Sequence, residues 1–329
     1  MLSTKVKNYF PHRQVLVTGA AGFLGSYLVD TLLELQASVV GVDNLITGKE
    51  ANLKKALNSP RFSFIKADVI DEPASYLPSN LSPDLVFHFA SPASPPHYQA
   101  KPKETYLVNS YGTHQLLSWL EKTNRHGRFI FASTSEVYGD PEVHPQPETY
   151  WGNVNPNGAR SCYDEAKRLG ETICGVWQRE FNLDVRIGRI FNTYGARLDP
   201  TDGRVISNFV DQALKQKPLT IYGEGTQTRS YCYVTDLIEG FLHLAALPNL
   251  AGETINLGNP EEYTVRQTAQ IIWSIINPDK KLKLKFQPLP QDDPVRRKPD
   301  ITKAKKLLNW KPKIDFKTGV RLMVDDLKH

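Results

Sequence analysis

Cysteine is scarce in this chain, and its few copies form no recognisable pattern. Three occur among 329 residues, at Cys162, Cys174 and Cys232, with no C-x-x-C spacing. An odd number of cysteines without such spacing indicates neither a zinc site nor a disulfide framework. We therefore expect no bound metal and a reducing compartment.

Long apolar runs are also missing. No stretch approaches the roughly 20 consecutive apolar residues that a membrane-spanning helix requires, and residues 1–13 contain no apolar core of signal-peptide length. We therefore expect a cytoplasmic protein that makes no membrane contact.

A strong excess of charge of one sign is the third absence. Lys and Arg number 40 against 35 Asp and Glu, a net charge of +5, and the lysines form no basic stripe with interleaved aromatic residues. This distribution gives no indication of a nucleic-acid surface and suits an anionic small molecule. The chain is long enough for one large α/β domain or two smaller ones, each with a sizeable core.

Three glycines near the N-terminus lie between an expected strand and an expected helix. The apolar run at residues 14–17 leads to Gly19, Gly22 and Gly25, and an apolar-periodic helix follows at residues 27–35. Such a turn brings the backbone close to a pyrophosphate at the helix N-terminus. A second strand ends at Asp43, where an acid binds a ribose diol and repels a 2′-phosphate, so the pattern favours NAD over NADP. The alternative is a helix-packing turn in an unrelated α/β domain.

A second group of polar residues extends from Ser133 to Lys167. It follows the apolar strand predicted at residues 129–132, so its hydroxyls and carboxylate emerge where open α/β sheets bind ligands. Tyr163 and Lys167 lie four residues apart and share one face of a helix. A neighbouring ammonium lowers the pKa of a phenol toward that of a general base. Such a pair alone is a weak signal, because it also occurs by chance on helix surfaces.

Beyond Tyr194 the pattern changes, because irregular Gly-, Pro- and Asp-rich segments alternate with short helices such as 205–214 and 234–247. We expect an α/β protein with a Rossmann-like, doubly wound parallel sheet and a smaller mixed α/β C-terminal substrate domain. The predicted division is residues 1–190 for the dinucleotide-binding domain and 191–329 for the second, with segments that return to the main sheet.

Longer segments resemble one family of nucleotide-sugar enzymes. Residues 133–171, the runs Ala90–Pro96 and Ile190–Gly195, and Gln291-Asp292-Asp293-Pro294 with the following Arg297–Ile301 are similar to the UDP-glucuronate decarboxylases, within the extended short-chain dehydrogenase/reductase superfamily. The resemblance covers nearly the whole chain. It implies the cofactor NAD, the substrate UDP-glucuronate, and a homodimer in which helices near residues 104–122 and 160–180 pack against their copies.

The resemblance also implies which residues bind each ligand. For NAD they are Gly19, Gly22, Phe23, Leu24, Gly25, Asp43, Asn44, Thr47, Asp68, Val69, Ser91, Tyr163 and Lys167. For the UDP-sugar they are Ser135, Asn192, Arg204, Asn208, Tyr222, Arg229 and Arg297. Two simpler alternatives remain open: Asp68 as a helix N-cap and Arg229 as a surface arginine in a loop. Asn109 is expected to steady its helix near Lys167, and His88 is expected to be a core histidine.

The implied chemistry has Tyr163 deprotonate the sugar's 4-hydroxyl, assisted by Lys167 and Thr134. The resulting 4-ketone makes the C6 carboxylate labile. Glu136 would face that carboxylate and Arg297 would bind it, or else Glu136 and Arg297 form only a structural ion pair. A 4-epimerase or a 4,6-dehydratase of the same fold is the alternative, although Ser135 stands where dehydratases carry a proton-donating Asp. A regulator that binds NAD without turnover is a third possibility.

Overall fold

The computed structural model describes residues 2–288 and 296–328, so the Gln291–Pro294 part of the family resemblance lies outside the described residues. The helical elements are α1 (Thr4–Lys7), α2 (Phe23–Glu34), η1 (Glu50–Leu53), η2 (Ala56–Asn58), α3 (Pro73–Tyr76), α4 (Pro95–Ala100), α5 (Pro102–Leu107), η3 (Val108–Gly112), α6 (Thr113–Thr123), η4 (Ser135–Tyr138), α7 (Ser161–Phe181), α8 (Val205–Leu214), α9 (Val234–Ala246), α10 (Val265–Ile276), α11 (Thr302–Leu308) and α12 (Phe316–Lys328).

The strands are β1 (Gln14–Thr18), β2 (Ser38–Asp43), β3 (Phe62–Lys66), β4 (Leu85–His88), β5 (Arg128–Thr134), β6 (Asp184–Ile190), β7 (Thr193–Tyr194), β8 (Leu219–Tyr222), β9 (Thr228–Ser230), β10 (Cys232–Tyr233), β11 (Thr254–Leu257), β12 (Glu262–Thr264), β13 (Leu284–Gln287) and β14 (Arg296–Arg297). Seven of them form one sheet in the order β11-β6-β5-β4-β1-β2-β3, and all six pairings are parallel. The predicted Rossmann-like fold is therefore confirmed, and the order of the strands reverses between β1 and β4, where such sheets bind ligands.

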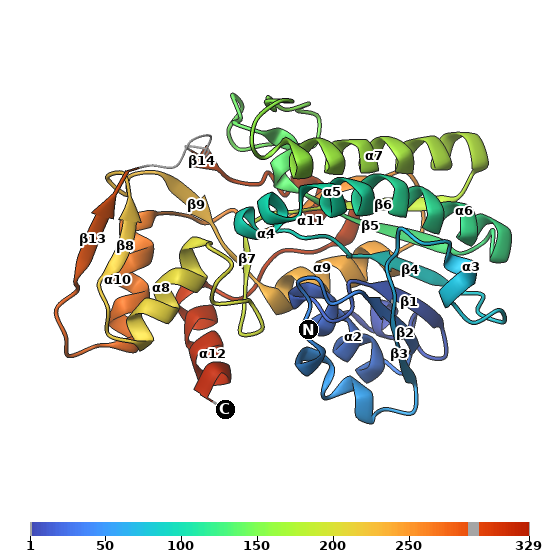
Figure 1. Cartoon of the computed structure of the whole chain (residues 1–329), viewed down its shortest axis with the longest axis horizontal. Coiled ribbons are helices and arrows are strands. Elements are labelled where there is room, and N and C mark those ends of the chain that lie inside the picture. Colours follow the sequence, from blue (N-terminus) through green and yellow to red (C-terminus); the bar gives the residue numbers. More distant parts are fainter. Residues whose placement is uncertain (1, 289–295, 329) are drawn as a thin grey trace.

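Helices cover both faces of this sheet (Figure 1). Alternate residues of a strand point to opposite faces. Val15 and Val17 of β1 accordingly pack with α2 and α9, whereas Leu16 packs with α6 and α7. Because both faces are buried, β1, β4 and β5 consist mostly of apolar residues and show no polar alternation.

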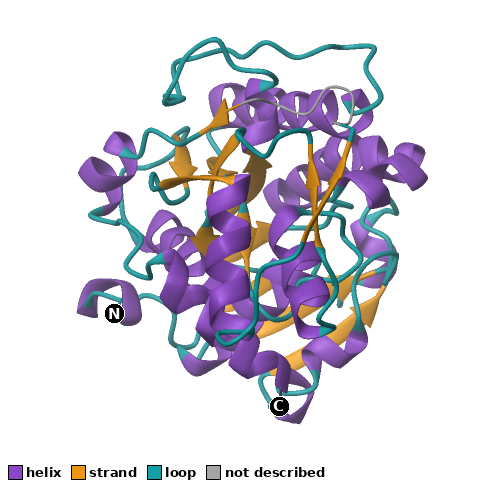
Figure 2. Cartoon of the chain, turned by 90° about the vertical axis from the view of Figure 1, so that its left-hand side faces the viewer, coloured by secondary structure: helices purple, strands orange, loops and turns teal. Residues whose placement is uncertain are grey.

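A smaller lobe is built from the chain after β7. β8 pairs with β13, and β9 lies between β12 and β14; α8 and α10 pack together, and α10 contacts α12. Figure 2 shows this lobe toward the viewer, with its short strands among the helices. Three elements beyond residue 190 lie in the large lobe: β11 pairs with β6, α9 packs against α2, and α11 contacts both β11 and α9. The division at residue 190 itself stays a prediction.

The proline-rich segment at residues 91–102 contains helical turns. Pro95 and Pro96 begin the short helix α4, and Pro102 begins α5. Proline suits the first helical turn, because its missing N–H has no helical partner there. The helix predicted at residues 104–122 likewise consists of α5, one π-helical turn and α6.

Two further expectations concern buried side chains. His88 is a core residue, with its ring nitrogens 2.8 Å from Thr18 Oγ1 and 3.2 Å from the Val108 carbonyl oxygen, and burial lowers its pKa to about 3. Of the three cysteines, Cys174 and Cys232 are buried and Cys162 is half-buried; none is in a disulfide. Across residues 2–288 and 296–328, no helix has the length and apolar character to cross a membrane.

Candidate active site

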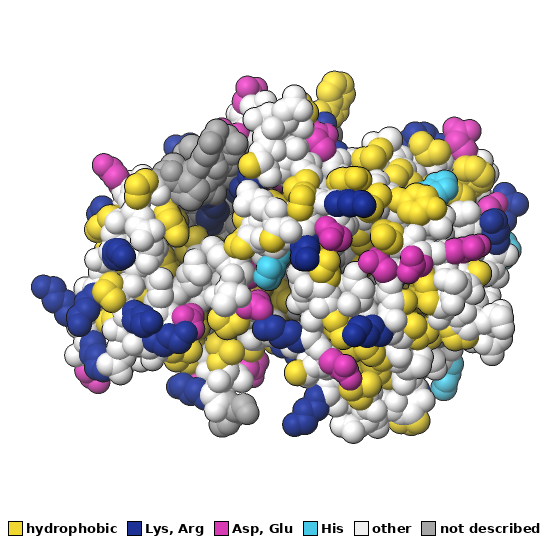
Figure 3. Space-filling model, in the orientation of Figure 1, with side chains coloured by type: hydrophobic (Ala, Val, Ile, Leu, Met, Phe, Trp, Pro, Cys, Tyr) yellow, Lys and Arg dark blue, Asp and Glu magenta, His cyan; other side chains and the backbone are white. Residues whose placement is uncertain are grey.

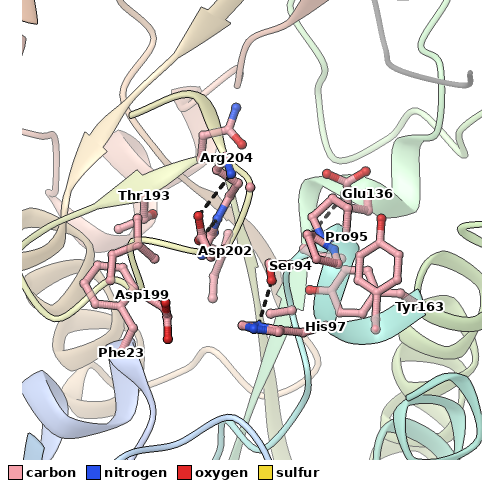
Figure 4. Close-up of a pocket in the computed structure, with 18 of the residues that line it drawn as sticks. Phe23, Ser94, Pro95, His97, Glu136, Tyr163, Thr193, Asp199, Asp202 and Arg204 are labelled. Carbon is pink, nitrogen blue, oxygen red and sulfur yellow. Dashed lines mark hydrogen bonds and ion pairs between the residues drawn. The ribbon is translucent and has the colours of Figure 1, made fainter. Parts of the chain in front are cut away.

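A cavity of about 920 Å³ opens between the large lobe and the smaller lobe, at the carboxyl ends of β1, β4 and β5. Figure 4 shows Arg204 and Asp202 on one side of this space and Glu136 and Tyr163 on the other. A second, smaller cavity adjoins it at the ends of β2 and β3. Every residue predicted to bind a ligand lines one of the two. Asp43, Asn44, Asp68 and Val69 line the smaller cavity, Gly19, Gly22, Thr47 and Ser91 line both, and the others line the larger one.

The glycine turn forms a narrow cradle between β1 and α2. Gly19 has a φ of +69°, and a Cβ there would lie 2.7 Å from the Ala90 nitrogen. A Cβ on Gly25 would collide with the Gly19 carbonyl, so both positions exclude any larger residue. The turn ends at Gly22, the N-cap of α2, which has no side chain to satisfy the first helical N–H groups. Those free donors suit a pyrophosphate.

The acid at the end of β2 is tied to this turn. One Asp43 oxygen accepts a hydrogen bond from the Ala21 nitrogen (2.9 Å) and the other accepts one from the Leu45 nitrogen (2.8 Å); burial raises the pKa of this carboxyl. Next to it, Asn44 donates to Asp68 (2.8 Å). The glycine cradle and the acid fit the pyrophosphate and ribose of NAD, which is the arrangement predicted from the sequence.

Asp68 is not a helix N-cap, because α3 begins later, at Pro73, with Glu72 as its cap. Its carboxylate instead accepts from the Ile70 nitrogen (3.1 Å) and from Asn44. Asn109 is fully buried and donates to Ser91 Oγ and to the Thr105 carbonyl, both at 2.8 Å. It therefore fixes the π-helical turn that packs against α7.

Tyr163 and Lys167 lie on the first turns of α7, which ends at Phe181 with Asn182 in the left-handed conformation. The Tyr163 phenol forms a hydrogen bond with Thr134, at the end of β5. Lys167 donates to the Ala132 carbonyl (2.6 Å). The predicted base, its hydrogen-bond partner and its lysine therefore meet at one corner of the cavity.

The predicted effect of Lys167 on Tyr163 differs from the structure. Burial raises the pKa of the Tyr163 phenol, the Thr134 hydrogen bond opposes that rise, and Lys167 is not one of the main groups that shift it. Burial also lowers the pKa of Lys167 to about 7. With this pKa the lysine carries only part of a positive charge near neutral pH. Its nitrogen also lies 5.9 Å from the centre of the phenol ring, so it favours the phenolate only weakly.

Glu136 is held between two guanidinium groups. One carboxylate oxygen pairs with Arg297 and the other with Arg160. Burial alone would raise the pKa of Glu136, but Arg297 and then Arg160 outweigh it and hold the pKa below its ordinary value. The ion pair between Glu136 and Arg297, which the sequence left open, therefore exists. It also lines the cavity, so it faces any ligand bound there.

The pairing of β9 with β14 brings Arg297 to this place, opposite Arg229. Arg229 is buried, not a surface arginine in a loop, and one of its nitrogens donates to the Thr228 carbonyl (2.8 Å). Arg204 is the N-cap residue of α8 and pairs with Asp202 at 2.5 Å. The smaller lobe thus contributes Arg204, Arg229 and Arg297 to the cavity wall, which suits the diphosphate and carboxylate of an anionic ligand.

Two neighbours of Tyr163 were not predicted from the sequence. The Tyr98 ring stacks on the Tyr163 ring, with centroids 5.0 Å apart and planes 4° apart. Arg160 is the N-cap residue of α7 and reaches Glu136. Nothing in the sequence signals Tyr98, because α4 meets α7 only in the fold. Arg160 had one signal: it lies four residues before Asp164, at the start of the expected helix.

These features define a dinucleotide-dependent enzyme of the Rossmann type, and the comparisons with known proteins agree. The model of the NAD dependent epimerase/dehydratase family matches residues 15–258. The chain belongs to this family.

Particular relatives are more closely similar. The chain is 48% identical to UDP-glucuronic acid decarboxylase 4 of Arabidopsis thaliana, over 96% of this chain and 68% of the relative. It is 44% identical to UDP-glucuronic acid decarboxylase 1 of Danio rerio, over 94% and 71%. Among solved structures, UDP-glucuronic acid 4-epimerase of Bacillus cereus, in complex with UDP-glucuronic acid and NAD, is 30% identical, with a TM-score of 0.85 and coverage of 96% and 99%.

Proposed function

We propose that this chain is an NAD-dependent UDP-glucuronate decarboxylase that forms UDP-xylose and carbon dioxide. One observation carries the proposal: Glu136, paired with Arg297 and Arg160, lies in the same cavity as the Tyr163 phenol and the glycine cradle. Arginine beside the reacting corner suits a substrate that carries a carboxylate on its sugar. The relatives named UDP-glucuronic acid decarboxylase support the same substrate and reaction.

The reaction begins with proton removal. Tyr163 accepts the proton of the sugar's 4-hydroxyl, and Thr134 holds the phenol oxygen in position through its hydrogen bond. NAD⁺, when bound at the glycine cradle, supplies a nicotinamide that accepts hydride from C4 and later returns it. Lys167 spans from the Ala132 carbonyl toward the same corner and would hold the nicotinamide ribose.

Oxidation at C4 places a ketone β to the C6 carboxylate, so the bond between C5 and C6 breaks with loss of carbon dioxide. The electron pair left on C5 spreads onto the C4 oxygen, where protonated Tyr163 and Thr134 stabilise the enolate. Arg297 holds the carboxylate beforehand, with Glu136 beside it. Protonation of C5 and reduction of C4 then give the pentose, with no net oxidation.

A 4-epimerase is the second candidate, because the Bacillus cereus structure is named a UDP-glucuronic acid 4-epimerase. Such an enzyme would use the same Tyr163 but leave the carboxylate in place. A 4,6-dehydratase is disfavoured because Ser135 cannot supply a proton to a leaving hydroxyl as an aspartate can.

Product analysis tests the proposal. Purified protein incubated with UDP-glucuronate and NAD is expected to release carbon dioxide and UDP-xylose, identified by mass spectrometry. Recovery of UDP-galacturonate without carbon dioxide would instead show a 4-epimerase. Binding of NAD without formation of either product would instead support a regulator that binds NAD without turnover.

We also propose that the protein is a homodimer. Tyr106, Tyr111, Leu169 and Val176 are large apolar side chains between 39% and 49% exposed, on the adjacent elements α5, η3 and α7. Figure 3 shows hydrophobic side chains gathered over these helices. A second copy with the same face would cover this surface by helix packing.

A cytoplasmic location remains part of the proposal. It is supported by the three cysteines, none of which forms a disulfide, since paired cysteines are typical of oxidising compartments. Cell fractionation with the native protein tests it: recovery in the cytosolic fraction is expected, and recovery inside secretory vesicles would contradict it.

A further inference from the structure

The single Glu136 carboxylate pairs with two guanidinium groups. Arg160 and Arg297 bind its two oxygens separately, and the three side chains are 16%, 5% and 16% exposed for Arg160, Arg297 and Glu136. Asp164 also lies 3.8 Å from the Arg160 Nε, but burial raises the pKa of this carboxyl to about 7, so it offsets the arginine charge only in part. The cluster therefore keeps a net positive charge in a place with little water. A buried charge that lacks a counter-charge is costly. This cluster is therefore suited to receive one further anion.

The two arginines are fixed in different ways. The Arg160 carbonyl accepts hydrogen bonds from the nitrogens of Tyr163 (2.9 Å) and Asp164 (3.1 Å), so this residue is part of the first turn of α7. Its Nε also lies 3.8 Å from Asp164. Arg160 is thus tied to the helix that carries the catalytic tyrosine.

Arg297 retains unused hydrogen-bonding capacity. One terminal nitrogen pairs with Glu136 and the other donates to the Gly139 carbonyl (3.1 Å). Its Nε is buried and has no hydrogen-bond partner. A buried donor of this kind is expected to find an acceptor when a ligand binds. Of the two arginines that hold Glu136, Arg297 is therefore the one suited to exchange partners.

We propose that Arg160 is a positioning residue that holds Glu136 and so frees Arg297 to bind the substrate's carboxylate. The inference rests on the proposed function and adds a determinant of specificity to it. With Arg160 present, two carboxylates meet two guanidinium groups. Without it, Glu136 and the substrate compete for Arg297, and one negative charge stays unpaired. Arg160 therefore makes the site accept a sugar acid.

Binding to the NAD-loaded protein tests this inference, with Tyr163→Phe present in every variant so that UDP-glucuronate is not consumed during the titration. The ligands are UDP-glucuronate and UDP-glucose, which differ in the charge at C6, and isothermal titration calorimetry gives their dissociation constants. Arg160→Met is expected to weaken the binding of UDP-glucuronate by at least about tenfold and the binding of UDP-glucose by at most about twofold. Arg160→Lys keeps the positive charge, so its affinity for UDP-glucuronate is expected to fall by less than about threefold.

The same substitution in a Glu136→Gln background separates positioning from direct contact. With no negative charge on residue 136, loss of Arg160 is expected to change UDP-glucuronate affinity by no more than about twofold. A tenfold loss that persists there would show that Arg160 itself binds the substrate, and would overturn the inference. The inference would also be overturned if Arg160→Met weakened the binding of UDP-glucuronate and UDP-glucose equally while the affinity for NAD stayed unchanged.

Failure here is distinguishable from failure of the proposed function. A wild-type protein that forms no UDP-xylose would contradict the proposed reaction, whatever the binding ratios of the variants. Conversely, Arg160→Met could leave the ratio of the dissociation constants for UDP-glucuronate and UDP-glucose unchanged. This result would overturn the role of Arg160 even if the wild type forms UDP-xylose.

Discussion

Tyr163 and Asp164 are consecutive residues of α7, and burial raises the pKa of both. For Tyr163 the raised pKa means that the neutral phenol predominates in the structure, so Thr134 and the bound ligands must favour its deprotonation. For Asp164 the pKa reaches about 7, because burial and the nearby Glu136 outweigh Arg160. One of its oxygens is also buried without a partner.

Replacing Tyr163 by phenylalanine tests its role as the base. The variant keeps the ring that stacks on Tyr98 and loses only the phenol oxygen, so the fold and NAD binding are expected to persist. Its kcat for UDP-glucuronate is expected to fall by about 10² to 10⁴-fold. Steady-state release of carbon dioxide measures this loss, and undiminished turnover would show that another group is the base.

Asp164 predicts a pH dependence of stability. Its pKa is about 3.9 in an unfolded chain and about 7 in the fold, so the folded state binds the extra proton between these values. This contribution to stability is complete below about pH 4 and is lost as the pH rises through about 7. In Asp164→Asn, the loss is absent. The free energy of unfolding of this variant relative to wild type is therefore expected to increase across that range, by up to about 4 kcal/mol for a shift of about three pKa units.

Denaturant unfolding at several pH values measures the difference. Asp325→Asn, an exposed position on α12, serves as the matched control and is expected to show no comparable trend. A flat difference for Asp164→Asn would contradict the raised pKa.

At the scale of elements, the turn between β1 and α2 is fixed by close contacts of backbone with backbone. Gly19→Ala is expected to destabilise the protein by about 1 to 3 kcal/mol and to abolish NAD binding, since a Cβ would meet the Ala90 nitrogen and the left-handed φ disfavours alanine. Thermal unfolding and NAD titration measure the two effects.

Gly175 in α7 provides the matched control. A Cβ there meets only the flexible end of Arg179, so Gly175→Ala is expected to stabilise the helix by about 0.5 to 1 kcal/mol. Similar effects of alanine at both positions would show that the turn does not require glycine.

At the scale of the whole molecule, the apolar face of α5, η3 and α7 determines the expected assembly. Leu169→Glu combined with Val176→Glu places two charges in the proposed interface and is expected to weaken the dimer by at least about a hundredfold. Sedimentation equilibrium measures the change. Leu322→Glu, at a 40% exposed position on α12, is the control and is expected to leave the dimer intact. A wild-type monomer would contradict the proposed assembly.

How far the sequence predicted this molecule depends on the range of the interactions. The strands, the glycine turn and the pair Tyr163–Lys167 follow from short periodicities and local spacing, and all are found in the structure. Tyr98 could not be identified in this way, and the spacing of Arg160 to Asp164 gave no indication of its contact with Glu136. Both roles depend on contacts, with Tyr163 and with Glu136, that only the packed fold creates. The expected lowering of the Tyr163 pKa was wrong for a related reason. The spacing of the sequence predicted the neighbouring Lys167 but not the burial of the phenol, which raises its pKa.

The half-buried cysteine has a practical consequence. Cys162 precedes Tyr163, and its thiol donates to the Tyr98 carbonyl at 3.6 Å. The other two thiols are buried. A maleimide dye would therefore attach first at Cys162, slowly and best in alkaline solution, because burial raises the pKa of this thiol. Its fluorescence would then report, one residue from the phenol, when the sugar enters and leaves.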